Sequence, residues 1–297
     1  MDWFIHHVNI QAYDVPEAVA FYRDIVGLRE AVWSYPDVVG DFAQDASSVA
    51  AFGSRNRGLH IVRAVPDFGL RNKLHHNPTI AGHVAISVPD AEQVKRRLEA
   101  AGHLVSDAGV YAMAGVRQLY VYDPYQNLVE INEVVDEAGG PRPAPGEAHG
   151  IRMEEGEWYL HHVNLPVHDV LLAAAFYRDL IGLTEGTWRT PAGSQVGDIT
   201  GNKAMLTYFG TTGNRGLHLV KPSDRLMGRT GFQHNPTIGG HPAITVKDLA
   251  GVMERLRKAG IPFSDAGTYA MAGIHQLYVY DPSMNPVEIN QVVDPLA

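Results

Sequence analysis

The chain has 297 residues, of which 45% are hydrophobic and 19% are charged, and its formal net charge is −9 at pH 7. This balance is typical of a globular protein, and its acidity argues against a nucleic-acid partner, because such proteins usually present a basic face. Cysteine is absent, which excludes disulfides, thiolate catalysis and thiolate ligands, so any metal must be held by nitrogen and oxygen.

The first ten residues lack the basic region and the apolar run that mark a signal peptide. No apolar stretch approaches the roughly 18 residues that suggest a membrane-spanning helix. We therefore expect a cytoplasmic protein that has no membrane partner and acts on a small molecule.

The sequence contains an internal repeat. HHVN at residues 6–9 recurs at 161–164, and FYRD at 21–24 recurs at 176–179, both at an offset of 155, whereas NRGLH, HNPTI and YAMAG recur at an offset of 158. The segment between the two copies is rich in Pro and Gly, as linkers are. The expected organisation is a first domain at 1–137, a linker at 138–156 and a second domain at 157–297.

Each half divides again into two modules. Every module opens with a histidine that is followed seven residues later by an aspartate, in the pairs His7 and Asp14, His83 and Asp90, His162 and Asp169, and His241 and Asp248. Residues 83–88 predict a strand, and residues 91–102 predict a helix with Val94 and Leu98 on one face. Short β-rich runs bounded by Pro, Gly or Asn complete each module. The pattern predicts an α+β fold of four tandem βαβββ modules.

The order of these motifs resembles the vicinal oxygen chelate (VOC) superfamily, which includes glyoxalase I, the bleomycin resistance proteins and the type I extradiol dioxygenases. The resemblance covers both halves and omits the linker. It depends on the His-to-Asp spacing, on FYRDIVGL and FYRDLIGL, and on DPYQNLVEIN and DPSMNPVEIN at the end of each half. It implies paired modules that curl into two cup-shaped VOC domains, each around a metal. Whether the paired modules come from one half or from opposite halves is left open.

The resemblance also implies which residues hold the metal, because the ligands of this family lie on the first strand of each module and on the last strand of the second. Carried over, these are His7, His83 and Glu130 in the first half, and His162, His241 and Glu288 in the second. The alternation of LVEIN independently places Glu130 opposite Val129 and Ile131, so its carboxylate faces the cup. A carboxylate in such a place is costly unless it is paired or binds a metal.

His6 and His161 compete for the same role, since each precedes an expected ligand. Successive strand residues are expected to face opposite ways, so both histidines of a pair cannot serve one site. The spacing to the aspartates favours His7 and His162. Two histidines and one carboxylate with open positions favour Fe(II) as the divalent metal, with Mn, Zn, Ni or Co as alternatives.

Four further residues bear on the reaction. Tyr120 and Tyr278 lie ten residues before the two glutamates, which resembles the spacing of the active-site tyrosine in type I extradiol dioxygenases, although strand tyrosines also serve in packing. His60 and His218 lie where the extradiol enzymes carry an acid–base histidine and glyoxalases a fourth metal ligand. An imidazole that titrates near neutrality suits proton transfer from a catechol. The alternative is a core histidine bonded to the backbone.

These features favour an extradiol-type dioxygenase that cleaves a catecholic aromatic with Fe(II) and O2. Departures from that family are Tyr111 and Tyr269, where a histidine is common, and Pro242 directly after an expected ligand. A glyoxalase-like isomerase, lyase or epimerase that needs no O2 is the first alternative. A metal-free ligand-binding protein is the second. A homo-oligomer is compatible with either enzyme.

Overall fold

The computed structural model describes residues 3–33, 47–54, 56–136, 158–210 and 213–294. The predicted linker at 138–156 lies outside these ranges, so the proposed domain boundaries stay a prediction. Among the helices in these ranges, none combines the length and the apolar character needed to cross a membrane.

The first half forms one eight-stranded sheet with the strand order β2-β3-β4-β1-β5-β8-β7-β6. Its first module contains β1 (Phe4–Ala12), α1 (Val15–Ala20), the π-helix η1 (Phe21–Val26), β2 (Glu30–Ala31), β3 (Val49–Ser54), β4 (Arg57–Arg63) and α2 (Phe68–Arg71). Its second module contains β5 (His83–Ser87), α3 (Ala91–Ala100), β6 (Ser106–Val110), β7 (Val116–Tyr122) and β8 (Leu128–Val134).

The second half forms a seven-stranded sheet with the order β10-β11-β9-β12-β15-β14-β13. Its first module contains β9 (Trp158–Pro166), α4 (Val170–Ala175), the π-helix η4 (Phe176–Ile181), α5 (Gly197–Thr200), β10 (Leu206–Phe209), β11 (Gly216–Val220) and α6 (Leu226–Thr230). Its second module contains β12 (His241–Val246), α7 (Leu249–Ala259), β13 (Phe263–Gly267), β14 (Ile274–Tyr280) and β15 (Pro286–Val292). An isolated bridge between Glu185 and Phe209 stands where the first half has the β2–β3 pair.

The opening strands of the two modules pair within each half. β1 runs antiparallel to β5, and β9 runs antiparallel to β12. Each sheet is therefore built from two consecutive modules, which answers the question that the sequence left open. The predicted α+β class and the tandem βαβββ modules are confirmed.

The aspartates of the four His-to-Asp pairs begin the four helices that follow the opening strands. Asp14, Asp90, Asp169 and Asp248 are the N-cap residues of α1, α3, α4 and α7, and each carboxylate accepts a hydrogen bond from a backbone N–H of the first turn. The repeated His-to-Asp spacing therefore reflects the number of residues between the histidine on the opening strand and the residue that caps the next helix.

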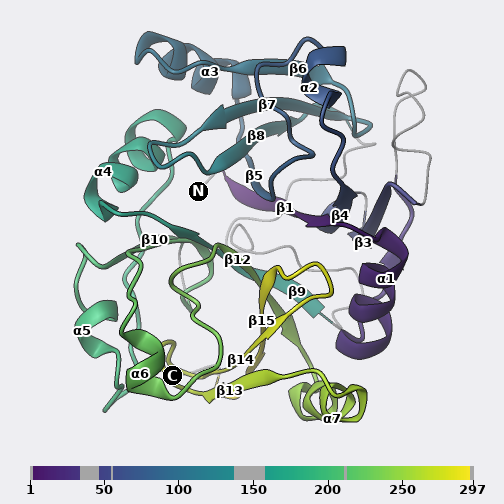
Figure 1. Ribbon diagram of the computed structural model, residues 1–297. Helices are drawn as coiled ribbons and strands as arrows, with labels where there is room; N and C mark the ends of the chain where they lie inside the picture. Colours follow the sequence, from purple (N-terminus) through teal and green to yellow (C-terminus); the bar gives the residue numbers. More distant parts are fainter. Residues whose placement is uncertain (1–2, 34–46, 55, 137–157, 211–212, 295–297) are drawn as a thin grey trace.

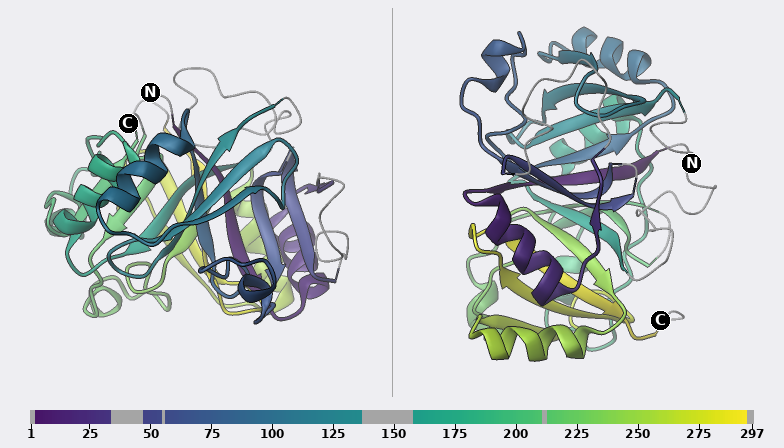
Figure 2. Two further views of the ribbon diagram at one scale, coloured as in Figure 1. Left: turned by 90° about the horizontal axis from the view of Figure 1, so that it is seen from above. Right: turned by 90° about the vertical axis from the view of Figure 1, so that its right-hand side faces the viewer.

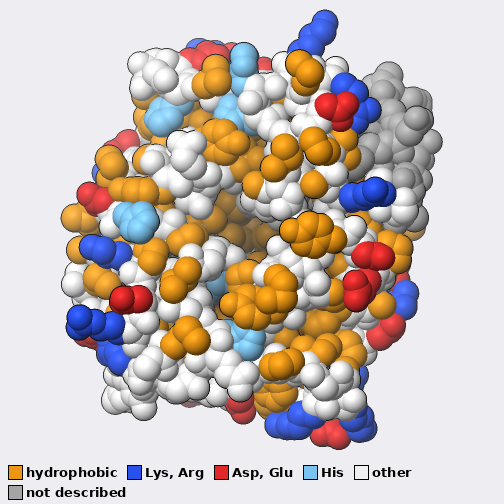
Figure 3. Space-filling view, in the orientation of Figure 1, with side chains coloured by type: hydrophobic (Ala, Val, Ile, Leu, Met, Phe, Trp, Pro, Cys, Tyr) orange, Lys and Arg blue, Asp and Glu red, His pale blue; other side chains and the backbone are white. Residues whose placement is uncertain are grey.

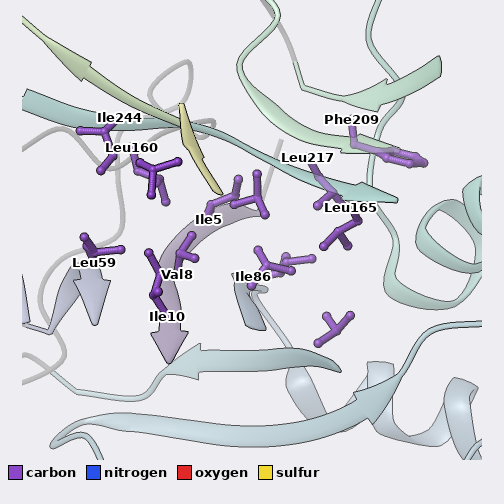
Figure 4. Close-up of a cluster of buried hydrophobic side chains, with 14 of the residues drawn as sticks. Ile5, Val8, Ile10, Leu59, Ile86, Leu160, Leu165, Phe209, Leu217 and Ile244 are labelled. Atoms are coloured by element: carbon purple, nitrogen blue, oxygen red, sulfur yellow. The ribbon is translucent and has the colours of Figure 1, made fainter. Parts of the chain in front are cut away.

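The two halves share one hydrophobic core. Both sheets contribute to it, for example through Val8 and Ile86 of the first half and Leu165 and Leu217 of the second (Figure 4). The last helix of each half lies against the first helical segment of the other, α3 against η4 and α7 against η1 (Figure 1). The right-hand view of Figure 2 shows the halves one above the other.

Two arginines tie the halves together symmetrically. Arg97 Nε of α3 donates to the Leu180 carbonyl in η4 at 2.7 Å, and Arg255 Nε of α7 donates to the Ile25 carbonyl in η1, also at 2.7 Å. Carbonyls in the last turn of a helix have no partner within it, so each arginine completes a helix end of the opposite half.

The surface is hollowed between the halves, with hydrophobic side chains around the opening (Figure 3). Residues of both halves line a cavity there of about 290 Å³, including Val8 and Ile10 of β1 and Val163 and Leu165 of β9. Two of the candidate metal ligands described next, His83 and His241, also line this cavity.

Candidate metal centres

Three of the expected ligands come together in the first half. His7 lies on β1, His83 begins β5, and Glu130 lies on β8, so three adjacent strands contribute one residue each. Nε2 of His7 is 3.6 Å from Oε2 of Glu130, and Nε2 of His83 is 3.4 Å from the same oxygen. All three side chains are buried and offer ligand atoms within 4.8 Å of one another.

The second half repeats this arrangement. Nε2 of His162 lies 3.6 Å from Oε2 of Glu288, and Nε2 of His241 lies 3.8 Å from it. Two atoms that bind one ion at about 2.1 Å lie roughly 3.0–3.4 Å apart, so these separations need to shorten only by tenths of an ångström. Imidazole nitrogen and carboxylate oxygen are suitable donors for a divalent first-row metal.

A small residue stands at the centre of each triad. Ala85 of β5 lies opposite His7 on one neighbouring strand and opposite Glu130 on the other. Ala243 of β12 stands in the same way between His162 and Glu288. Residues in register on adjacent strands point to the same face, so a methyl group at this position leaves room between the ligands.

The carboxylates are held by side-chain amides and face no cation among the described residues. Gln276 Nε2 donates to Glu288 Oε2 at 3.0 Å, and Asn290 Nδ2 donates to Oε1 at 2.7 Å. Burial raises the pKa of Glu288 to about 7, against the opposing effect of these hydrogen bonds. In the first half, Gln118 and Asn132 donate to Glu130 in the same way. A buried carboxylate without a positive partner fits a metal ligand.

The expectation that His6 and His161 face away from their neighbours is wrong. On β1, Ile5 pairs with Ile86 while His7 pairs with Ala85, so His6 is an extra residue in a β-bulge. Nδ1 of His6 consequently lies 3.0 Å from Nδ1 of His7. The same register shift on β9 places Nδ1 of His161 2.9 Å from Nδ1 of His162.

His60 and His218 lie beside the triads. The His60 ring stacks on His7 with centroids 4.0 Å apart, and the His218 ring stacks on His162 at 3.9 Å. Their Nε2–H groups donate to the carbonyls of Asn56 at 2.7 Å and of residue 214 at 2.6 Å, which leaves a lone pair on each Nδ1. Burial lowers the pKa of both imidazoles to about 3, so the expectation that they titrate near neutrality is wrong for these buried rings, which make the backbone hydrogen bond of the alternative interpretation. They are neutral in the metal-free protein, and their role in proton transfer stays a prediction.

The two expected tyrosines lie directly opposite the glutamates. Tyr120 pairs with Glu130 across β7 and β8, and Tyr278 pairs with Glu288 across β14 and β15. Burial and the nearby carboxylate raise the pKa of both phenols, so they are neutral donors at pH 7.

The residues that depart from the extradiol pattern differ between the halves. Tyr269 shares a hydrogen bond with Tyr278, with their hydroxyl oxygens 2.9 Å apart. Tyr111 instead donates to Oδ1 of Asn72 at 2.6 Å. Within the described residues, a hydrogen-bonded pair of tyrosines therefore lies beside the second triad and not beside the first.

Sequence reasoning missed the amides that hold the glutamates and a tryptophan in each half. Trp33 and Trp188 lie against the rings of His60 and His218, at centroid distances of 4.3 and 4.7 Å, and donate Nε1–H to a backbone carbonyl. All of these residues recur between the halves, so the repeat itself was the signal that could have identified them.

The second half has a pocket above its triad. Its wall away from the metal ligands is apolar and is formed by residues in and around α5, β10, β11 and α6: Val196, Ile199, Leu206, Val220 and Leu226. Trp188, His218, Tyr269 and Tyr278 also line it, and no Lys or Arg is among the described residues that do so.

Comparison with known proteins adds independent information. A family model described as the Glyoxalase/Bleomycin resistance protein/Dioxygenase superfamily matches residues 4–131 and 159–289. The comparison with curated proteins gives no match.

Several solved structures share the fold. The Mn(II)-bound glyoxalase from Novosphingobium aromaticivorans superposes with a TM-score of 0.58 at 14% identity, over 99% of this chain and 82% of that one. The 2,3-dioxygenase LapB from Pseudomonas sp. KL28 gives 0.60 at 14% identity, over 98% and 91% of the two chains. The halotolerant catechol dioxygenase BphC gives 0.58 at 16%, over 100% and 90%. At these identities the similarity concerns the fold.

Proposed function

Since the chain belongs to the Glyoxalase/Bleomycin resistance protein/Dioxygenase superfamily, we propose that it is an extradiol-type dioxygenase that uses a divalent metal, Fe(II) by preference, and O2 to cleave a catecholic aromatic. The observation that carries the proposal is the juxtaposition, in each half, of two histidines, a glutamate, a neutral imidazole and a neutral phenol. Two histidines and one carboxylate are the donor types with which non-haem Fe(II) oxygenases hold their metal.

The metal, held by His162, His241 and Glu288 or by their first-half equivalents, would supply positive charge that favours the ionised diol and brings it together with O2. The chain's own residues handle the proton. Nδ1 of His218 carries a lone pair beside the triad, since Nε2–H donates to a backbone carbonyl. It would accept a substrate hydroxyl proton and return it later, while the hydroxyl of Tyr278 would donate a hydrogen bond to a reacting oxygen.

The pocket walls support an aromatic substrate without a charged substituent. An apolar wall buries a ring favourably, whereas a carboxylate brought against it would lose its hydration without gaining a cation. We therefore propose an unsubstituted, alkyl or aryl catechol in preference to a carboxylated one.

The proposal is tested by reconstituting the anaerobically purified protein with Fe(II) and measuring O2 uptake with a panel of catechols. One O2 consumed per ring opened is the expected result. The control is the Glu130→Gln/Glu288→Gln double variant, which keeps the size of both side chains but removes their charge. Equal uptake by this variant would contradict the proposal.

A glyoxalase-like isomerase, lyase or epimerase is the alternative that uses the same ligands. It would move a proton between substrate carbons and need no oxidant. Turnover of a ketone or diol under strict anaerobiosis, supported by Zn or Ni, would favour this alternative over the dioxygenase.

A further inference from the structure

A pair of adjacent buried histidines occurs at the same bulge in both halves, and one member of each pair is absent from the ligand triads. His6 and His161 are fully buried, and the ring of each lies edge-on to its neighbour, with an interplanar angle of 81° in both pairs. A bulge costs one regular ladder position, and bulges that re-aim a side chain are common beside functional sites. Its repetition calls for an explanation other than packing.

The contact between the paired rings constrains their hydrogens. The Nδ1 atoms are 3.0 Å apart in the first half and 2.9 Å apart in the second, so one of the two nitrogens must carry a hydrogen and the other must accept it. Nε2 of His7 and of His162 points to the carboxylate of its triad. For Nε2 to bind a metal it must present a lone pair, which places the hydrogen of the neutral ring on Nδ1.

We propose that His6 and His161 are positioning residues whose Nδ1 accepts the Nδ1–H of His7 and His162, holding each ligand in its metal-binding tautomer. The bulge exists to bring the acceptor onto the same face as the ligand. Ligand histidines commonly donate their second N–H to a carboxylate or a carbonyl, and loss of such a partner typically weakens metal binding about 10- to 100-fold. Here a second imidazole takes that place.

The proposed arrangement leaves one buried hydrogen-bond donor of each outer histidine unsatisfied. In the proposed tautomer the remaining hydrogen of each outer imidazole is on Nε2, and Nε2 of His6 and of His161 is buried with no hydrogen-bond partner among the described residues. A buried donor that is left unsatisfied is unfavourable. Both halves nevertheless keep this unsatisfied donor. A role of the outer histidine in orienting its neighbour explains why. The inference rests on the proposed metal sites and is independent of whether the reaction consumes O2.

The test isolates one site and varies the acceptor. In a Glu288→Ala background, where only the first triad is complete, His6→Leu removes the acceptor, whereas His6→Asn keeps an oxygen able to accept from His7 Nδ1. Zn(II) affinity is measured by competition with a chromophoric chelator. We expect His6→Leu to bind Zn(II) about 10- to 100-fold more weakly than the parent and His6→Asn to bind within a few-fold of it. His161→Leu and His161→Asn in a Glu130→Ala background repeat the comparison.

Zn(II) affinity in the Leu variant equal to that of the parent would overturn the inference, because His6 would then have no role in metal binding. An equal loss of affinity in the Leu and Asn variants would also overturn it, because the effect would then come from packing. If a variant does not fold, ¹⁵N NMR of the histidine rings in the Zn(II)-loaded parent decides. A hydrogen on His7 Nδ1 with coupling to His6 Nδ1 supports the proposed hydrogen bond, and a hydrogen on His6 Nδ1 overturns it. Absence of Zn(II) binding in the parent would instead refute the metal site itself.

Discussion

The hydroxyl of Tyr22 donates a hydrogen bond to Oδ2 of Asp281 at 3.1 Å, joining residues that are 259 positions apart. Tyr177 makes the reciprocal bond to Oδ2 of Asp123 at 3.0 Å. Both tyrosines belong to the FYRD motifs and both aspartates to the turns before the last strands. The motifs on which the family resemblance depends therefore hold the two halves of this chain together.

We expect Tyr22→Phe to destabilise the protein by about 1.5–3 kcal/mol, since a buried carboxylate loses one of its donors. Tyr177→Phe should have a similar effect. Urea denaturation measures the change, and metal content is the control because neither tyrosine contacts a triad. Loss of metal with unchanged stability would contradict this role.

The methyl group between the ligands makes a second prediction. Ala243→Leu would fill the space between His162 and Glu288, so we expect the second site to lose its metal while the first retains it. Ala85→Leu should do the reverse. Overpacking also costs about 1–3 kcal/mol, so folding is checked by circular dichroism. Two metals per chain in either variant would show that the space between the ligands is not required.

The buried imidazoles predict acid sensitivity of the metal-free protein. His60 and His218 have a pKa of about 3 when folded, against an ordinary value of 6.5 for an exposed imidazole, so the unfolded chain binds protons that the folded chain does not. Their contribution to stability is complete above pH 6.5 and declines as the pH falls toward 3. Glu288 acts in the opposite sense. Because its pKa is raised to about 7, the stability that it contributes to the folded protein is lost as the pH rises through 7.

Burial also lowers the pKa of His6, His7, His161, His162 and His241. Because these histidines outnumber Glu288, we expect the free energy of unfolding to fall between pH 6.5 and pH 5. Urea denaturation of the metal-free protein at both values tests this. The His60→Asn/His218→Asn variant should show a smaller pH dependence. If this variant loses as much stability between pH 6.5 and pH 5 as the parent does, the acid sensitivity comes from groups other than His60 and His218.

Substrate charge provides a prediction about the pocket. With Fe(II) bound, we expect kcat/KM for an alkyl or aryl catechol to exceed that for a carboxylated catechol by at least about tenfold, the equivalent of 1.4 kcal/mol. Leu226→Arg would introduce a cation into the apolar wall and should narrow the difference. A preference of the unmodified protein for the carboxylated catechol would refute the proposal that the apolar wall disfavours a charged substrate.

The modules could be predicted because they depend on local spacing, and the family resemblance supplied the expected ligands, which the structure brings together in each half. The seven residues from His7 to Asp14 are a strand and a helix cap, and alternation alone turns Glu130 toward the cup. The bulge at His6 could not be predicted. One extra residue changes which face of the sheet the following side chains point to, and the alternation of polar and apolar residues does not reveal it. The bond between Tyr22 and Asp281 escaped because it depends on how two separate sheets pack.

We propose that each half holds one divalent metal on two histidines and a glutamate. Metal analysis after reconstitution with Fe(II) tests it most directly, applied to the parent, to Glu130→Ala, to Glu288→Ala and to the double variant. We predict two ions per chain in the parent, one in each single variant and none in the double variant. Metal retained by the double variant at the level of the parent would contradict the account.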